Sequence, residues 1–172
     1  MAILKILTYP DTFLKQKAKP VKENDSSVQK LIDYMAETMY DAPGTGLAAI
    51  QVGSDKSIIV YNDLPGEEEG ELKVLINPVI VSSSGETLSE QEGCLSVPEY
   101  REDVKRAQYV HVEGLDRDGK PVTIKTDEFL AIVLQHEIDH LNGILFIDRI
   151  SKLKRNLYKK KVIKNKNRQG KD

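Results

Sequence analysis

The chain has 172 residues, a length that suits one compact domain with a core of its own. Its apolar fraction of 40% and charged fraction of 30% are typical of a soluble globular protein, and no apolar run approaches the roughly 18 residues of a membrane span. The formal net charge is −2, but 152–172 hold ten Lys/Arg and one acid, which leaves 15 basic and 26 acidic residues in 1–151.

Two helices are expected in the N-terminal part of the chain. The first is short, covers 11–18 and follows a proline that disfavours a helix running in from upstream. The second is capped by Ser26 or Ser27 and ends at Pro43 and Gly44. Its apolar residues recur at helical spacing and predict a core-facing stripe: Val28, Leu31, Ile32, Met35 and Met39.

The middle of the chain predicts strands. Apolar and β-branched runs indicate them over 57–63, 72–78, 79–84 and near 85–93. An acidic Gly/Pro turn is expected over 64–71. Residues 103–126 predict a hairpin, because apolar and polar residues alternate and Asp118-Gly119 supplies a turn.

The strongest helical pattern covers 127–142. Thr126 or Asp127 can cap this helix, and Gly143 suits its C-terminal end. A terminal helix with a thin apolar stripe is expected over 148–165. Strands together with a central and a terminal helix predict an α+β protein.

The central helix carries a pattern that indicates metal chemistry. His136 and His140 are four residues apart, so a helix places both imidazoles on one face, where they can share one divalent ion. Glu137 is offset by about 100° and can reach the open coordination position as a general base. The alternative is that these residues only form a charged helix face. This is disfavoured, because two of the chain's three histidines fall at this spacing around a glutamate.

A catalytic site of this kind usually has a third protein ligand. Cys94 is the better candidate, since thiolate is a strong ligand and EGCLSVPEYR reads as a shaped loop. An acidic residue could be the third ligand instead. His111 is a weaker candidate, because nothing around it in the predicted hairpin suggests a metal site. The other interpretation of Cys94 is a buried apolar filler.

Three blocks occur in order along the chain: GTGLAAIQ at 44–51, EGCLS at 92–96 and QHEIDH at 135–140. With them the sequence resembles the peptide deformylase family, and the terminal helix is similar to that of the bacterial type. Thr45 and Ile50 are mild departures at variable positions. The resemblance implies antiparallel β-sheets packed around a central metal-binding helix, followed by a C-terminal helix. We expect 1–150 to form the catalytic domain and 151–172 its basic C-terminal helix or tail.

The resemblance implies an enzyme that removes the N-formyl group from formylmethionine of nascent polypeptides and releases formate. It implies Cys94, His136 and His140 as ligands of one divalent ion. A water bound to this ion, whose pKa the metal lowers, would attack the formyl carbon. Glu137 would take the water's proton and deliver it to the leaving amine.

The resemblance also implies roles for residues of the first two blocks and for Arg101. The resemblance implies that Gln51 and the backbone N–H of Leu95 stabilise the oxyanion, although the Gln51 amide could instead cap backbone groups. Gly46 matches a family glycine whose backbone contacts the substrate. Arg101 matches a position near the peptide end of the substrate; the other interpretation of Arg101 is a surface charge without a role in binding.

Two further features shape the predicted substrate pocket. The tight loop Gly44-Thr45-Gly46 suits a site that admits a small formyl group. Phe129 and Ile132 lie on the helix face above the metal, where they line a slot for the methionine side chain or pack in the core.

The metal and the partners are predicted more broadly. A Cys/His/His set suits Zn²⁺, Fe²⁺, Ni²⁺ or Co²⁺, and the resemblance favours Fe²⁺ in the cell. The basic segment 152–172 is either a solvated helix face or a contact for ribosomal RNA, which the resemblance also implies. The lone cysteine and the lack of signal-peptide features favour the cytoplasm, and we expect a monomer without membrane contact.

Two other functions fit parts of the pattern. An H-E-x-x-H metalloprotease would need a third ligand other than Cys94, and only Asp148, beyond the helix end, lies close after His140. A non-enzymatic ribosome-associated binder could keep a metal for stability, but such a structural site needs no base at Glu137.

Overall fold

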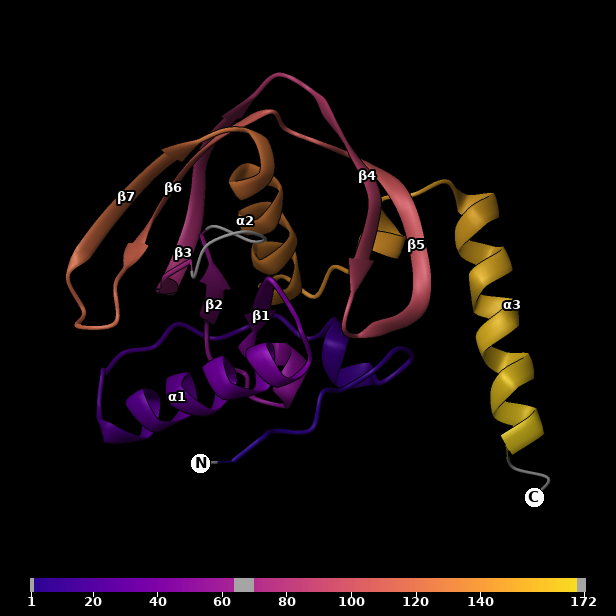
Figure 1. Ribbon diagram of the computed structural model, residues 1–172, viewed down its shortest axis with the longest axis horizontal. Helices are drawn as coiled ribbons and strands as arrows, with labels where there is room; N and C mark the ends of the chain where they lie inside the picture. Colours follow the sequence, from indigo (N-terminus) through magenta and orange to yellow (C-terminus); the bar gives the residue numbers. More distant parts are fainter. Residues whose placement is uncertain (1, 64–69, 170–172) are drawn as a thin grey trace.

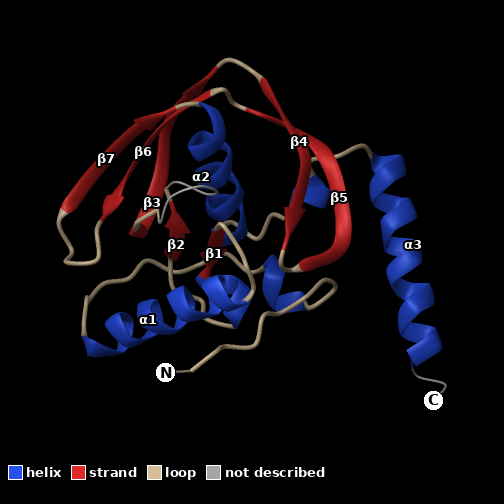
Figure 2. Cartoon of the chain, in the orientation of Figure 1, coloured by secondary structure: helices blue, strands red, loops and turns tan. Residues whose placement is uncertain are grey.

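A computed structural model describes residues 2–63 and 70–169 of the chain. The fold is α+β, as predicted: two antiparallel sheets and three α-helices, one of them C-terminal (Figures 1 and 2). The larger sheet has the strand order β1-β2-β3-β6-β7, and the smaller sheet consists of β4 and β5. The predicted acidic turn at 64–71 lies largely in 64–69, outside the described residues.

Strand bounds follow the chain in order. The larger sheet contains β1 (Gly46–Ala48), β2 (Ile58–Asn62), β3 (Leu72–Ser84), β6 (Tyr109–Leu115) and β7 (Pro121–Thr126). The smaller sheet contains β4 (Thr87–Cys94) and β5 (Val97–Arg106).

The alternation of side chains along β2 explains how the helices cover the larger sheet. Ile58 and Val60 belong to one core cluster, together with the α1 (Ser26–Asp41) stripe. Ile59 and Tyr61 belong to the other, together with α2 (Glu128–Leu141). Because successive residues of a strand point to opposite faces, α1 and α2 lie on opposite sides of this sheet.

The central helix predicted over 127–142 is α2, and most of its residues are buried. It lies between the larger sheet and the β4–β5 pair (Figure 1), and residues Val133 to Leu141 are all buried. Gly143, with φ 72°, follows its C-terminal end as predicted, and a Cβ there would lie 2.4 Å from the Lys15 carbonyl oxygen. Asp127 precedes the helix, but its side chain makes no capping hydrogen bond.

The N-terminal helices match the prediction with two differences. The stripe of α1 is buried at Val28, Ile32, Met35 and Met39, whereas Leu31 is only partly buried. Its cap is Asp25, not Ser26 or Ser27, because Asp25 Oδ1 accepts hydrogen bonds from the Ser27 and Val28 amides at 2.9 and 3.0 Å. The helix predicted over 11–18 is a single 3₁₀ turn, Thr12–Lys15.

Two strand predictions were wrong in their connections. The runs 72–78 and 79–84 form one strand, β3, because its pairing with β6 continues past a bulge. Asn77, with φ 52°, lies at this bulge. The predicted hairpin 103–126 is shorter, since only β6 and β7 form it. Its first residues belong to β5, because the Gln135 side chain bonds both the N–H and the C=O of Ala107 at 2.9 Å and interrupts the ladder there.

The terminal helix α3 (Lys152–Gln169) begins later than the predicted 148, because Phe146–Asp148 form a 3₁₀ turn first. It lies beside β5, outside the two sheets (Figure 1). Its buried contact is Tyr158, whose ring stacks on Tyr100 with centroids 4.6 Å apart. Lys154 adds an ion pair to Glu102 of β5 at 2.8 Å. Among the described helices, none is both long and apolar enough to cross a membrane.

Candidate active site

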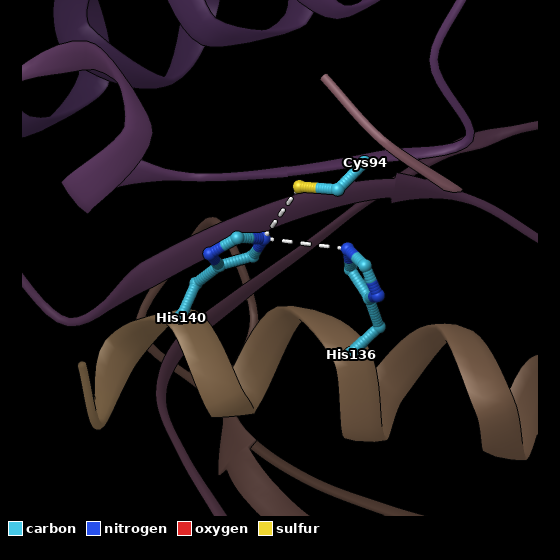
Figure 3. Close-up of side chains that lie close together, drawn as sticks. All are labelled: Cys94, His136 and His140. Atoms are coloured by element: carbon cyan, nitrogen blue, oxygen red, sulfur yellow. Dashed lines mark hydrogen bonds between the residues drawn. The ribbon is translucent and has the colours of Figure 1, made fainter. Parts of the chain in front are cut away.

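Three side chains from two elements converge as predicted. Cys94 ends β4, and His136 and His140 lie one turn apart on α2 (Figure 3). The Cys94 Sγ lies 3.2 Å from His140 Nε2, which lies 3.3 Å from His136 Nε2, and the three atoms all lie within 4.8 Å of one another.

This geometry fits a metal ion. Tetrahedral ligands held about 2.0–2.3 Å from one ion lie roughly 3.3–3.7 Å apart, close to the separations of these atoms. Burial lowers the pKa of His140 well below its ordinary value, which favours the neutral ring that a metal ligand requires. At His136, by contrast, burial is outweighed by hydrogen bonds with Cys94 and Glu92, which raise its pKa. Sulfur with two imidazoles suits a borderline divalent transition metal.

The other predicted ligand candidates lie elsewhere. His111 is on β6, with Nε2 3.4 Å from Glu113. Asp148 accepts hydrogen bonds from Lys15 Nζ at 2.7 Å and from the Leu145 amide at 2.9 Å, where it closes the 3₁₀ turn. The described part of the chain brings neither residue to the Cys94 trio.

Glu137 presents a buried carboxylate beside the trio. It is 4% exposed, and among the described residues its Oε2 has no hydrogen-bond partner. Burial raises the pKa of Glu137 to about 7. A carboxyl group with a pKa near neutrality can both accept and donate a proton at physiological pH.

Gly46 forms the wall against which Glu137 lies. A Cβ at this position would lie 2.6 Å from Glu137 Oε1 and 2.9 Å from its Cδ, so a side chain here would displace the carboxylate. The sequence predicted a glycine that contacts substrate through its backbone. The structure adds that a hydrogen is needed here to leave room for the carboxylate.

The Gln51 carboxamide is held at both ends. Its Oε1 accepts a hydrogen bond from the Ala48 amide at 2.9 Å, and its Nε2 donates to Ser96 Oγ at 3.1 Å. The same Nε2 donates its second hydrogen to Cys94 Sγ at 3.7 Å, so this hydrogen points into the trio. Sequence reasoning did not single out Ser96, although it ends the EGCLS block.

A cleft of about 830 Å³ opens over the trio, between the β4–β5 pair, the glycine loop and the first turns of α2. The residues predicted to contact substrate or oxyanion all line it: Gly44, Thr45, Gly46, Gln51, Leu95, Arg101, Phe129 and Ile132. Arg101 donates to the Gln91 carbonyl at 3.3 Å, and Phe129 is 47% exposed. Cys94, His136 and Glu137 also line the cleft.

A buried set of charges, which the sequence analysis did not predict, lies behind the trio. Glu92 Oε1 lies 2.6 Å from His136 Nδ1, and Arg106 bonds both oxygens of Glu92, at 2.5 and 3.2 Å. Although burial opposes ionisation, these hydrogen bonds from His136 and Arg106 lower the pKa of Glu92 to about 2. A carboxylate on the far nitrogen orients a histidine so that its other nitrogen faces a metal.

A cysteine-and-histidine cluster beside a buried carboxyl group on an H-E-x-x-H helix is typical of one class of protein, the hydrolases built around a metal-binding site. Residues 3–156 match the model of the polypeptide deformylase family, and the chain belongs to this family of enzymes. The peptide deformylase of Desulfosudis oleivorans is 55% identical over 164 residues, 95% of each chain. That of Thermodesulfovibrio yellowstonii is 56% identical over 161 residues, 94% of this chain and 97% of the relative.

Solved structures agree with this assignment over nearly the whole chain. The peptide deformylase of Legionella pneumophila superposes with a TM-score of 0.88 at 48% identity and covers 99% of both chains. A class I type b peptide deformylase from Acinetobacter baumannii, solved with Met-Ala-Ser bound, gives 0.82 at 38% identity, covering 87% of this chain and 99% of its own.

Proposed function

We propose that this enzyme removes the N-formyl group from the N-terminal formylmethionine of nascent polypeptides and releases formate. The observation that carries the proposal is the meeting of three ligand atoms beside Glu137, whose Oε2 has no hydrogen-bond partner among the described residues, at a cleft that Cys94, His136 and Glu137 line. Family membership and the Met-Ala-Ser complex of the Acinetobacter baumannii relative support the substrate class, since a peptide that begins with methionine is the other product.

Cys94, His136 and His140 would hold one divalent ion. Such an ion supplies Lewis acidity, which activates a water molecule and polarises a carbonyl. The donor set fits Fe²⁺, Zn²⁺, Ni²⁺ and Co²⁺, and we propose Fe²⁺ in the cell.

The chain's own groups would move the proton and hold the charge. Glu137 accepts a proton from the attacking water and delivers it to the leaving amine, so that water and formamide become formate and an ammonium group. The Gln51 Nε2–H and the Leu95 N–H donate to the oxygen that becomes negative. Ser96 keeps the Gln51 amide turned the right way, because it accepts one of the two Nε2 hydrogens.

The cleft would bind the rest of the substrate. The loop Gly44-Thr45-Gly46 would border the place of the formyl group, and the lack of a side chain at Gly46 leaves the backbone free to approach this group beside Glu137. Phe129 and Ile132 would contact the methionine side chain, and Arg101 at the rim would meet the peptide beyond it.

The direct test is formate release from a formyl-Met tripeptide, with metal analysis of protein purified without oxygen. We expect turnover by the wild type, metal without turnover for Glu137→Gln, and loss of metal or turnover for Cys94→Ser. No formate from the Fe²⁺ or Ni²⁺ form, or normal hydrolysis by both variants, would overturn the proposal.

We also propose that the cationic helix α3 contacts ribosomal RNA and that residues 1–150 act as the catalytic domain of a cytoplasmic monomer. The lysines and arginines of α3 are mostly exposed, and such a surface binds phosphates in a salt-dependent way. Wild-type protein should therefore sediment with ribosomes at low salt. Deletion of 152–172 should abolish this, and unchanged co-sedimentation would refute the contact.

A further inference from the structure

A row of alternating charges connects the proposed metal site with the segment between α2 and α3. Beyond Glu92, Arg106 Nη1 bonds Asp139 Oδ2 at 2.6 Å. Asp139 is next to His140 on α2, and Arg106, Glu92 and Asp139 have side chains only 2%, 6% and 9% exposed. The row therefore lies in the protein interior, where ion pairs are weakly screened.

Arg149 ends this row at the solvent side. Its Nε and Nη2 form a two-pronged contact with both oxygens of Asp139, at 2.5 and 2.6 Å. Arg149 follows the 3₁₀ turn Phe146–Asp148 and precedes α3, so it lies outside α2. It does not line the cleft either. Its side chain is 41% exposed, in contrast to the other members.

Arg106 shares its hydrogen bonds between Glu92 and Asp139, and the role of Arg149 follows from this sharing. Arg106 has one guanidinium for two carboxylates: Nε and Nη2 bond Glu92, and Nη1 bonds Asp139. With Arg149 present, Asp139 has a second cation, and Nε and Nη2 of Arg106 keep their hydrogen bonds to Glu92. Without Arg149, the buried Asp139 carboxylate has Arg106 as its remaining cation in this row. We expect Arg106 then to turn toward Asp139 and loosen its hold on Glu92.

We propose that Arg149 is a positioning residue for the metal site: it anchors Asp139 so that Arg106 braces Glu92, which in turn orients the His136 ring. The proposal rests on the metal site of the proposed function, with His136 as a ligand. It assigns to the connection before α3 a part in holding the metal, although no atom of Arg149 lines the cleft.

The test compares Arg149→Met, Arg149→Lys and the control Arg117→Met as Zn²⁺- and Co²⁺-loaded proteins. Arg117 makes a similarly short ion pair, 2.5 Å to Asp33 of α1, and it does not line the cleft. Loss of an outer partner of a metal ligand typically costs 10–100-fold in affinity, and Arg149 acts on that partner, Glu92, through Asp139 and Arg106. We expect Arg149→Met to release Zn²⁺ to a chelator about 10-fold faster and to change the Co²⁺ absorption spectrum. Arg149→Lys should recover part of both, and Arg117→Met should match the wild type.

A double-variant cycle separates positioning from general loosening. In a Glu92→Gln background, Arg149→Met should add little, because the route to His136 is already weakened. Wild-type metal release and spectrum in Arg149→Met, or full additivity with Glu92→Gln, would overturn the inference. Failure of the proposed function would look different, since the wild type itself would then bind no stoichiometric metal or would bind it as well with Cys94→Ser.

Discussion

Substitution of Gly46 by alanine tests whether the place of the Glu137 carboxylate decides the rate. The added Cβ would lie 2.6 Å from Glu137 Oε1, whereas ordinary van der Waals contact begins near 3.4 Å. The carboxylate must therefore retreat by about 0.8 Å, and a misplacement near 1 Å can cost about 100-fold in rate. We expect kcat to fall about 100-fold, equivalent to about 2.7 kcal/mol of transition-state stabilisation.

Formate release measures the effect, and metal content should remain at the wild-type level because no ligand moves. Overpacking also costs about 1–3 kcal/mol of stability, so a control must share that cost. Gly114→Ala serves this purpose: its Cβ would lie 3.1 Å from the Ile76 carbonyl oxygen, in the larger sheet. It should lower the unfolding midpoint and leave kcat unchanged.

The mechanism predicts non-additivity as well. If Gly46→Ala acts through the carboxylate, it should have almost no further effect in a Glu137→Ala background. Wild-type kcat in Gly46→Ala, or a full 100-fold loss in both backgrounds, would refute the reasoning. In that case the glycine would serve the substrate rather than the carboxylate.

Three further outcomes are expected. Gln51→Met removes an oxyanion donor and should lower kcat about 10²–10³-fold with metal retained; a loss below fivefold would exclude Gln51 from that role. Asp25→Ala removes two capping hydrogen bonds and should destabilise the protein by about 1 kcal/mol in urea unfolding with unchanged kinetics, whereas unaltered stability would contradict the cap. Tyr158→Ala removes the ring between Tyr9 and Tyr100 and should cost about 3 kcal/mol and speed amide exchange along α3; equal exchange rates would show that other contacts dock the helix.

The sequence predicted elements whose signals are local and periodic. The stripe from Val28 to Met39 and the run 127–142 both show helical spacing, and both are helices that bury that face. The trio was likewise predictable, since His136 and His140 are fixed by helix geometry and a thiol is chemically distinctive. The Cys94 position itself required the three-block resemblance or a loop argument.

Features that depend on distant partners were missed or misjudged. Glu92 and Arg106 are 14 residues apart, and Arg106 and Asp139 are 33 apart, so no periodicity links them. The start of the predicted hairpin was wrong for the same reason: a side chain on α2, Gln135, takes the backbone hydrogen bonds of Ala107. The Asp25 cap was local, but Ser26 and Ser27 are capping types as well and competed with it.

The Gln135 bridge has a mechanical consequence. Ala107 is the point where the chain passes from the smaller sheet into the larger one, and the bridge fastens that point to the helix that bears the histidines. One residue earlier, Arg106 is fastened to the same helix through Asp139. The β4–β5 pair is therefore fixed to α2 at the corner where the chain leaves it for the larger sheet, and a displacement of the pair away from α2 would have to break both contacts.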